Sequence, residues 1–154
     1  MGLIRNKINI GVINGPNINL LGIREPKAYG NEKWDDIEQR VRSLAKEINA
    51  DVRFYQSNHE GAIVDFIQNN INIFDGVIIN PAAYTKTGYA ILDALTAVNT
   101  PYIEVHLSNI FFRGGWHAES IFSSNAVGQI IGFKGFGYEL AFRAISNHIF
   151  NACK

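Results

Sequence analysis

Short runs of β-branched and aromatic residues alternate with longer helical patterns along this chain. The runs predict strands over residues 7–13, 52–55, 76–79, 102–106 and 127–133. Apolar residues repeat at steps of three and four in the intervening segments, and this spacing predicts helices over 33–49, 57–71, 88–98 and 137–150. Regular alternation of strand and helix is typical of the α/β class.

Two of the predicted helices carry start signals. The sequence Ser57-Asn58-His59-Glu60 has the form of a capping box, which predicts that the second helix opens there. Acidic residues stand in the first turns of the helix over 33–49, where the helix dipole favours negative charge.

The order of the elements predicts one parallel sheet, because strand–helix–strand units with right-handed crossovers pair their strands in parallel. The continuous apolar run over 76–79 is expected of a strand that is covered on both faces. A length of 154 residues suits a single domain over residues 1–154. That size favours a flavodoxin-like three-layer sandwich, with strand order 2-1-3-4-5, over a full Rossmann fold.

Composition and charge exclude several partners. Lysine plus arginine equals aspartate plus glutamate at 14 each, so there is no basic excess that would bind nucleic acid. The first apolar run is too short for a membrane span or a signal peptide, and we expect a cytoplasmic protein. Cys153 is the only cysteine, which excludes an internal disulfide and fits a reducing compartment. The chain lacks CxxC and HExxH, so no metal is expected.

Ligands of such sheets bind beyond the carboxyl ends of the strands, where strands one and three diverge. This rule selects the loops over residues 14–29, 80–87 and 106–117. The first loop is unusually long, and Gly22 and Gly30, which bracket its second half, could act as hinges of a lid.

The first of these loops contains Arg24 and Tyr29, five residues apart. A free phenol is protonated at neutral pH, but a nearby guanidinium favours the phenolate, which is a base. The alternative is structural: Tyr29 would cover apolar surface and Arg24 would be solvated. The residues of this loop alone leave both interpretations open.

A second pair, Glu104 and His106, stands two residues apart on a predicted strand and therefore faces one side of the sheet. A carboxylate beside an imidazole fixes its tautomer and favours its protonated form, which suits a general acid. A core histidine bonded to Glu104 for packing is the alternative. Asn80 is either a hydrogen-bonding group or a turn signal before Pro81.

Two further features are weaker. The backbone amides of Ser108 and Asn109 could hold a carboxylate, although a Ser-Asn pair is usually a turn. The glycine-rich stretch over 132–137 does not spell GxGxxG and falls at strand five, not at strand one, which disfavours a nucleotide or flavin binder.

Four blocks, in the right order and at the right spacing, resemble the type II 3-dehydroquinate dehydratases. They are Asn14-Gly-Pro-Asn-Ile-Asn-Leu-Leu-Gly22 with Arg24-Glu-Pro26 and Tyr29-Gly30, then Gln56-Ser-Asn-His-Glu-Gly61, Ile79-Asn-Pro-Ala-Ala-Tyr-Thr85 and Ile103-Glu-Val-His-Leu-Ser-Asn109. The resemblance runs almost without gaps from about Ile8 to the final helix. It implies a flavodoxin-like fold, a dodecamer of four trimers, and interconversion of 3-dehydroquinate and 3-dehydroshikimate without metal or cofactor.

The resemblance also implies the reaction chemistry. Tyr29 would remove the proton next to the ketone, with Arg24 holding it as phenolate. Asn17 would hold a water molecule that stabilises the resulting enolate. His106, oriented by Glu104, would protonate the departing hydroxyl group.

Substrate contacts follow from the same resemblance. The substrate carboxylate would meet Asn80 and the backbone amides of Leu107 and Ser108. Asp93 stands in an apolar helix, where a solvated aspartate is the default; the resemblance implies that it reaches a neighbouring subunit's site.

Two positions depart from the family pattern, and both family positions contact ring hydroxyls. Lys86 replaces a histidine in Thr85-Lys86-Thr87, and His117 replaces an arginine, while Arg113 is retained and could substitute. Because imidazole cannot copy the planar fork of a guanidinium, we expect weaker substrate binding or a preference for a related ring acid. The alternative from another class is a catalytically silent relative that binds a small carboxylate or serves as an assembly scaffold.

Overall fold

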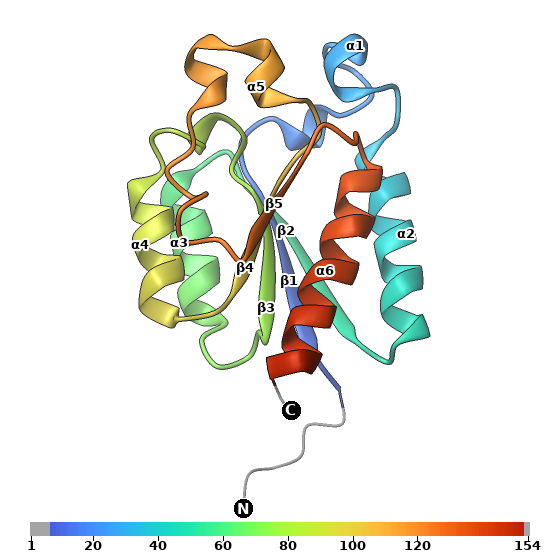
Figure 1. Cartoon of the computed structure of the whole chain (residues 1–154), viewed down its shortest axis with the longest axis vertical. Coiled ribbons are helices and arrows are strands. Elements are labelled where there is room, and N and C mark those ends of the chain that lie inside the picture. The colour runs from blue at the N-terminus through green and yellow to red at the C-terminus, as the bar shows by residue number, and fades with distance from the viewer. Residues whose placement is uncertain (1–6, 153–154) are drawn as a thin grey trace, which may run out of the picture.

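Within residues 7–152, which the computed structural model describes, five parallel strands form a sheet in the order β2-β1-β3-β4-β5 (Figure 1). The strands are β1 (Asn9–Asn14), β2 (Asp51–Gln56), β3 (Gly76–Asn80), β4 (Tyr102–His106) and β5 (Gly128–Ile131). The predicted flavodoxin-like strand order is therefore confirmed. Cys153, on which the expectation about disulfides rests, lies outside the described residues.

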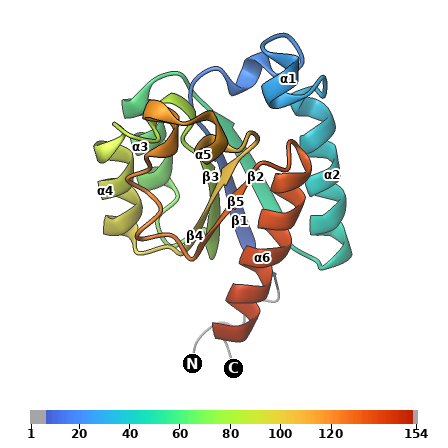
Figure 2. The ribbon, with the colours of Figure 1, turned by 45° about the horizontal axis from the view of Figure 1, so that its top comes forward.

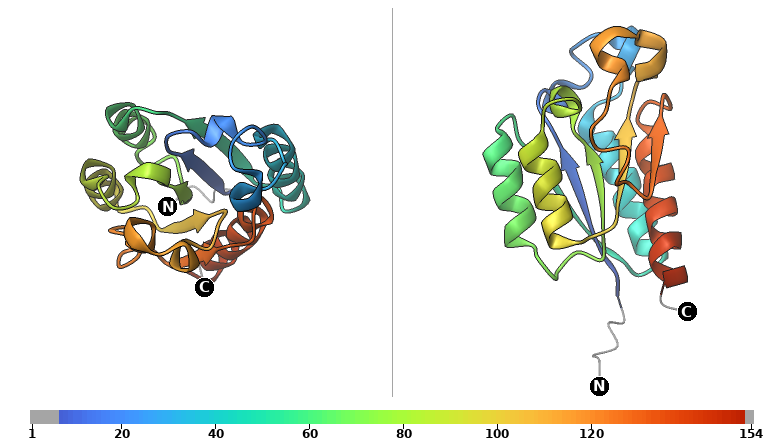
Figure 3. Two further views of the ribbon diagram at one scale, coloured as in Figure 1. Left: turned by 90° about the horizontal axis from the view of Figure 1, so that it is seen from above. Right: turned by 60° about the vertical axis from the view of Figure 1, so that its left-hand side comes forward.

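Helices cover both faces of the sheet, which gives the predicted three layers (Figures 1 and 3). The helices α3 (Glu60–Asn69) and α4 (Tyr89–Val98) cover one face, and α2 (Trp34–Glu47) and α6 (Phe136–Ala152) cover the other. Each face has its own apolar core. Burial on both faces explains why the central strands read as continuous apolar runs in the sequence.

The pleat of the central strands divides their side chains between these two cores. Ile10 and Val12 of β1 and Ile78 of β3 pack with α2 and α6, whereas Ile13 and Ile79 pack with α3 and α4. All five side chains are buried. A shift of one residue in register would send each of these side chains to the wrong core, so packing fixes the register.

The predicted capping box is wrong. The hydroxyl oxygen of Ser57 accepts from the backbone amide of His59 at 3.0 Å, and His59 precedes the first helical residue, Glu60. The Ser57 side chain therefore closes a local turn onto the backbone amide two residues later. This hydrogen bond competes with helix capping, which would use the same hydroxyl oxygen. The helix also ends at Asn69, two residues before the predicted Ile71.

The loops at the carboxyl ends of the strands contain short helices that the sequence pattern does not predict. They are η1 (Ile18–Leu20), α1 (Pro26–Tyr29), η2 (Ala82–Tyr84), α5 (Ile110–Arg113) and η3 (Gly115–Ala118). Each has only three or four residues, which is too short for a helical repeat to show in the sequence. Figure 2 shows α1 and α5 above the carboxyl ends of the strands.

A close backbone contact joins two of these loops. The amide of Gly15, after β1, donates to the carbonyl of Asn80 at the end of β3, at 2.8 Å. A Cβ atom at position 15 would lie 2.3 Å from the carbonyl oxygen of Pro81, so only glycine fits there. The contact holds the loop after β1 and the loop after β3 together at the point where the strand order reverses.

Within residues 7–152, no helix is both long and apolar enough to cross a membrane.

Candidate active site

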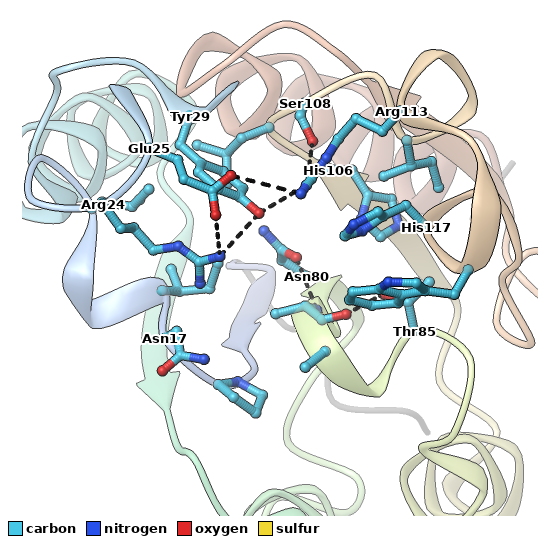
Figure 4. A pocket seen from close by; sticks show the side chains of 18 residues that line it. Asn17, Arg24, Glu25, Tyr29, Asn80, Thr85, His106, Ser108, Arg113 and His117 are labelled. Carbon is cyan, nitrogen blue, oxygen red and sulfur yellow. Dashed lines mark hydrogen bonds and ion pairs between the residues drawn. The ribbon is translucent and has the colours of Figure 1, made fainter. Parts of the chain in front are cut away.

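A cavity of about 300 Å³ opens at the carboxyl ends of β1, β3 and β4 (Figure 4). All three loops that the sequence selected contribute to its wall. The wall includes Asn17, Arg24, Glu25 and Tyr29 from the first loop, Asn80 and Thr85 from the second, and His106, Leu107, Ser108, Arg113, Trp116 and His117 from the third. This position at the switch point of the sheet is the one that parallel α/β folds use for ligands.

Two arginines approach the phenol oxygen of Tyr29. The Arg24 guanidinium donates to this oxygen at 3.3 Å, and the Arg113 guanidinium donates at 2.9 Å. Both guanidiniums also lie near the phenol ring, at 4.6 Å and 5.5 Å from its centroid. The sequence suggested only Arg24 for this position. One oxygen thus accepts hydrogen bonds from two cationic groups that come from different loops.

Glu25 lies beside both arginines, and the sequence analysis did not single it out. Its carboxylate oxygens are 3.5 Å from Arg24 and 3.7 Å from Arg113. The backbone of Glu25 has a φ of 34°, a strained left-handed conformation, immediately before the short helix α1 that carries Tyr29. The carboxylate thus joins two arginines that are far apart in the sequence.

His106 contacts a fully buried carboxylate. Its Nε2 lies 2.7 Å from Oε1 of Glu104, and the two side chains are 6% and 0% exposed. Since a carboxylate only accepts hydrogen bonds, Nε2 carries a proton and Nδ1 is the nitrogen that can exchange one. The predicted pairing of Glu104 with His106 is present, and His106 lines the cavity.

Two residues behind Glu104 were not predicted. The hydroxyl of Ser120 donates to Glu104 at 2.6 Å, and the amide of Gln129 donates at 2.8 Å. Burial alone would raise the pKa of the Glu104 carboxyl, but hydrogen bonds from His106, Ser120 and Gln129 hold that pKa below its usual range. Gln129 pairs with Glu104 in the register of β4 and β5, a relation that only the folded sheet reveals.

The residues predicted to contact a carboxylate lie at the end of β3 and at the start of the third loop. Ser108 is buried, and its hydroxyl accepts a hydrogen bond from Arg113 at 3.3 Å. Asn109 caps α5, since its side chain accepts from the amides of Phe111 and Phe112. Asn80 is 2% exposed, and its side-chain carbonyl oxygen accepts a hydrogen bond from the backbone amide of Ala82 at 3.1 Å.

His117 and Asn17 line the cavity at other points. The His117 ring lies against Trp116, with centroids 3.7 Å apart. Burial, assisted by the positive charge of Arg113, lowers the pKa of His117, while Glu25 opposes this shift. The side chain is therefore a neutral donor and acceptor at pH 7. Asn17 adopts a left-handed conformation, with a φ of 67°, and its amide donates to Asn58 at 3.0 Å.

Three predicted site residues do not line this cavity. Glu104 lies behind its hydrogen-bond partner His106, and Lys86 and Asp93 lie elsewhere. The Lys86 amine forms an ion pair with Glu119 at 2.7 Å and borders a separate hollow with Tyr89 and Phe111. Asp93 is exposed on α4. Among residues 7–152, no group of three or more histidine, cysteine or acidic side chains is arranged to hold a metal ion.

Fold and cavity together define an α/β protein with a polar ligand site at the switch point of a flavodoxin-like sheet. Residues 8–146 match the family model described as dehydroquinase class II. This chain therefore belongs to the class II dehydroquinase family.

Individual relatives agree with this membership. The chain is 53% identical over 132 residues to the 3-dehydroquinate dehydratase of Endomicrobium trichonymphae, covering 86% of this chain and 92% of that protein. It is 50% identical over 133 residues to the catabolic 3-dehydroquinase of Penicillium rubens, covering 86% of each chain. The crystal structure of type II dehydroquinase from Butyrivibrio crossotus DSM 2876 superimposes with a TM-score of 0.88 at 44% identity, covering 91% of this chain and 98% of that one.

We predict that Glu104→Gln destabilises the protein by about 2 kcal/mol or more at pH 7, because a neutral amide cannot accept from all three donors. Since the pKa of Glu104 is lower in the folded state, its contribution is fully present above the unfolded value of 4.5 and is lost as pH falls below it. Urea unfolding of both proteins at pH 7 and below pH 4.5 measures this. A difference that stays constant with pH would contradict the prediction.

Proposed function

We propose that this protein is a 3-dehydroquinate dehydratase, a hydro-lyase that converts 3-dehydroquinate into 3-dehydroshikimate and water. The Tyr29 phenolate takes the proton from the carbon next to the ketone, and the electron pair moves onto the ketone oxygen to form an enolate. Collapse of the enolate forms the carbon–carbon double bond and expels the hydroxyl group, which leaves as water with a proton from His106. Family membership and the cavity geometry support this proposal.

The single observation that carries the proposal is the contact of Tyr29 with two guanidiniums. The Tyr29 oxygen accepts hydrogen bonds from Arg24 at 3.3 Å and from Arg113 at 2.9 Å, so two cationic donors are already in place at the atom that is proposed to take the proton. Removal of a proton next to a ketone requires a base that is already ionised at the working pH. This arrangement supports Tyr29 in that role.

The acid lies across the same cavity. His106 with its buried partner Glu104 supports donation of a proton to a leaving hydroxyl, because the carboxylate stabilises the imidazolium that must precede the transfer. Asn17 also lines the cavity, on the side of Arg24, which supports its proposed hold on the water that stabilises the enolate (Figure 4). Base and acid on separate loops let one bound ring meet both.

The substrate carboxylate is proposed to bind at Asn80 and the backbone amides of Leu107 and Ser108. All three residues line the cavity next to His106, and Asn80 and Ser108 are buried. The amide N–H groups at this buried site can donate hydrogen bonds to a carboxylate. We therefore assign this side of the cavity to the carboxylate and the opposite side to the ketone.

The assembly expected from the family, a dodecamer of four trimers, is part of this proposal. Asp93 is exposed and lies outside the cavity of its own chain, which is consistent with a contact to a neighbouring subunit's site. Lys86 is held by Glu119 outside the cavity, so its proposed contact with ring hydroxyls has less support than that of His117.

A catalytically silent relative has less support than an active enzyme. The departures at Lys86 and His117 motivated that alternative, but the base and acid groups remain in contact with their partners. A flavin or nucleotide binder has less support again, since a cavity of about 300 Å³ is at the small end for ligand sites and suits a small ring acid.

We predict that Tyr29→Phe lowers kcat for 3-dehydroquinate by about 10²- to 10⁴-fold, the usual contribution of a general base. The ultraviolet absorbance of the conjugated enone product follows the reaction directly. Tyr55→Phe is the matched control, because that ring stacks on Phe66 beside the core under α3 and α4 and does not line the cavity. Undiminished turnover by Tyr29→Phe would refute the assignment of the base.

We further predict that His117→Arg lowers the Michaelis constant about fivefold and leaves kcat nearly unchanged. The added fork of donors would restore about 1 kcal/mol of hydrogen bonding to ring hydroxyls, which contributes equally to substrate and transition state. His148→Arg adds the same charge on the exposed face of α6 and serves as the control. Identical kinetics for His117→Arg and the parent would remove His117 from the substrate site.

A further inference from the structure

A buried chain of three polar side chains lies directly behind the cavity. The hydroxyl of Tyr138 donates to the carbonyl oxygen of Asn14 at 2.6 Å, and the amide nitrogen of Asn80 donates to the Tyr138 oxygen at 2.9 Å. The three side chains are 0%, 1% and 2% exposed. Asn14 and Asn80 are register partners at the ends of β1 and β3, and Tyr138 stands in the first turn of α6.

The direction of each hydrogen bond in this chain follows from one fixed donor. The backbone amide of Ala82 can only donate, so the side-chain atom of Asn80 that faces it must be the carbonyl oxygen. The amide nitrogen of Asn80 therefore faces Tyr138, whose oxygen must accept. The Tyr138 hydroxyl is then free to donate its own hydrogen bond, and the side-chain carbonyl oxygen of Asn14 accepts it. A single arrangement satisfies all of these contacts.

Reversal of the Asn80 amide would break this arrangement. Its nitrogen would then face the amide nitrogen of Ala82, and both of these donors would be left without an acceptor. Burial also raises the pKa of the Tyr138 phenol, so the group stays protonated and keeps its proton for Asn14. The buried chain thus fixes which atom of Asn80 is left for the cavity.

We propose that Tyr138 is a positioning residue, which holds Asn80 so that its second amide N–H points into the cavity toward the carboxylate of the ring substrate. The inference deepens the proposed function and rests on it. Asn80 lines the cavity. In Figure 4 its amide nitrogen is turned toward the middle of the view, on the side of Arg24 and Tyr29. A primary amide nitrogen has two protons, and Tyr138 uses one of them.

The orientation matters because an anion discriminates between the two ends of an amide. An N–H group attracts a carboxylate, whereas an amide carbonyl in the same position repels it. Without the Tyr138 hydroxyl, one of the two contacts that orient the Asn80 side chain is lost. The carboxylate stands on the carbon that loses the hydroxyl group, but it keeps its own charge and bonds through the reaction, so its contact is expected to bind substrate and transition state about equally.

Tyr138 also packs in the core, and the test must separate the ring from its hydroxyl. Its ring meets Trp34 edge-on, with centroids 5.1 Å apart. The substitution Tyr138→Phe keeps this ring contact and removes only the hydroxyl. Ser146→Ala removes another buried hydroxyl of α6, which donates to the carbonyl of Phe142, and is the matched control for stability.

For Tyr138→Phe we expect the Michaelis constant for 3-dehydroquinate to rise about tenfold, equivalent to about 1.4 kcal/mol, with kcat within about twofold of the parent. The dissociation constant of quinate, a non-reacting ring carboxylate, measured by calorimetry should rise by the same factor. Ser146→Ala should change neither constant. Loss of binding with kcat preserved is a result that general destabilisation does not give.

Asn14→Ser provides a second variant, because it removes the acceptor of the Tyr138 proton. It should raise the Michaelis constant similarly, and in the Tyr138→Phe background it should add little, since both act through Asn80. If either variant folds and binds quinate like the parent, the proposal is overturned; if one does not fold, the other decides. A parent protein that binds quinate but does not turn over 3-dehydroquinate would instead count against the proposed function.

Discussion

The contact of one phenol oxygen with two guanidinium groups is the interaction on which the account of this site depends. Arg24 lies five residues from Tyr29 and can reach it within one loop. Arg113 stands in α5, in the loop after β4, and is 84 residues away from Tyr29. Like charges of two arginines repel, and the carboxylate of Glu25 between them offsets that repulsion. The proposed base and its two cationic partners are therefore brought together by the fold rather than by a local motif.

The topology of the sheet makes this assembly possible. Because β1 lies between β2 and β3, the loops that leave β1 and β3 diverge, and a cavity opens at the point of divergence. The hydrogen bond from the amide of Gly15 to the backbone carbonyl of Asn80 joins the ends of β1 and β3. The buried side-chain hydrogen bonds through Tyr138 join the same two strand ends. The proposed acid, His106, ends the next strand and faces the same cavity.

Much of the fold could be predicted from the sequence, because buried parallel strands and amphipathic helices leave clear periodic patterns. Strand β4 was predicted with its observed bounds, and the other strands within two residues. The short helices of the loops could not be predicted, since a single turn has no repeat. The turn at Ser57 was misread because the same side chain can cap a helix or close a turn, and the sequence does not say which.

The candidate site was only partly accessible to sequence reasoning. The strand alternation was enough to pair Glu104 with His106, because residues two apart share a face. The approach of Arg113 to Tyr29 and of Gln129 to Glu104 depends on which loops and strands become neighbours, and nothing local in the sequence signals it. The position of Lys86 was not foreseen either, because its partner Glu119 lies in another loop.

The most direct test asks whether the two arginines act through Tyr29. Steady-state kcat for 3-dehydroquinate at saturating substrate would be measured for Arg24→Gln and Arg113→Gln, each in the parent and in the Tyr29→Phe background. The account predicts that each arginine substitution lowers kcat in the parent and causes little further loss once the phenol oxygen is absent. Equal losses in both backgrounds would contradict it, because the arginines would then act on the reaction independently of that oxygen.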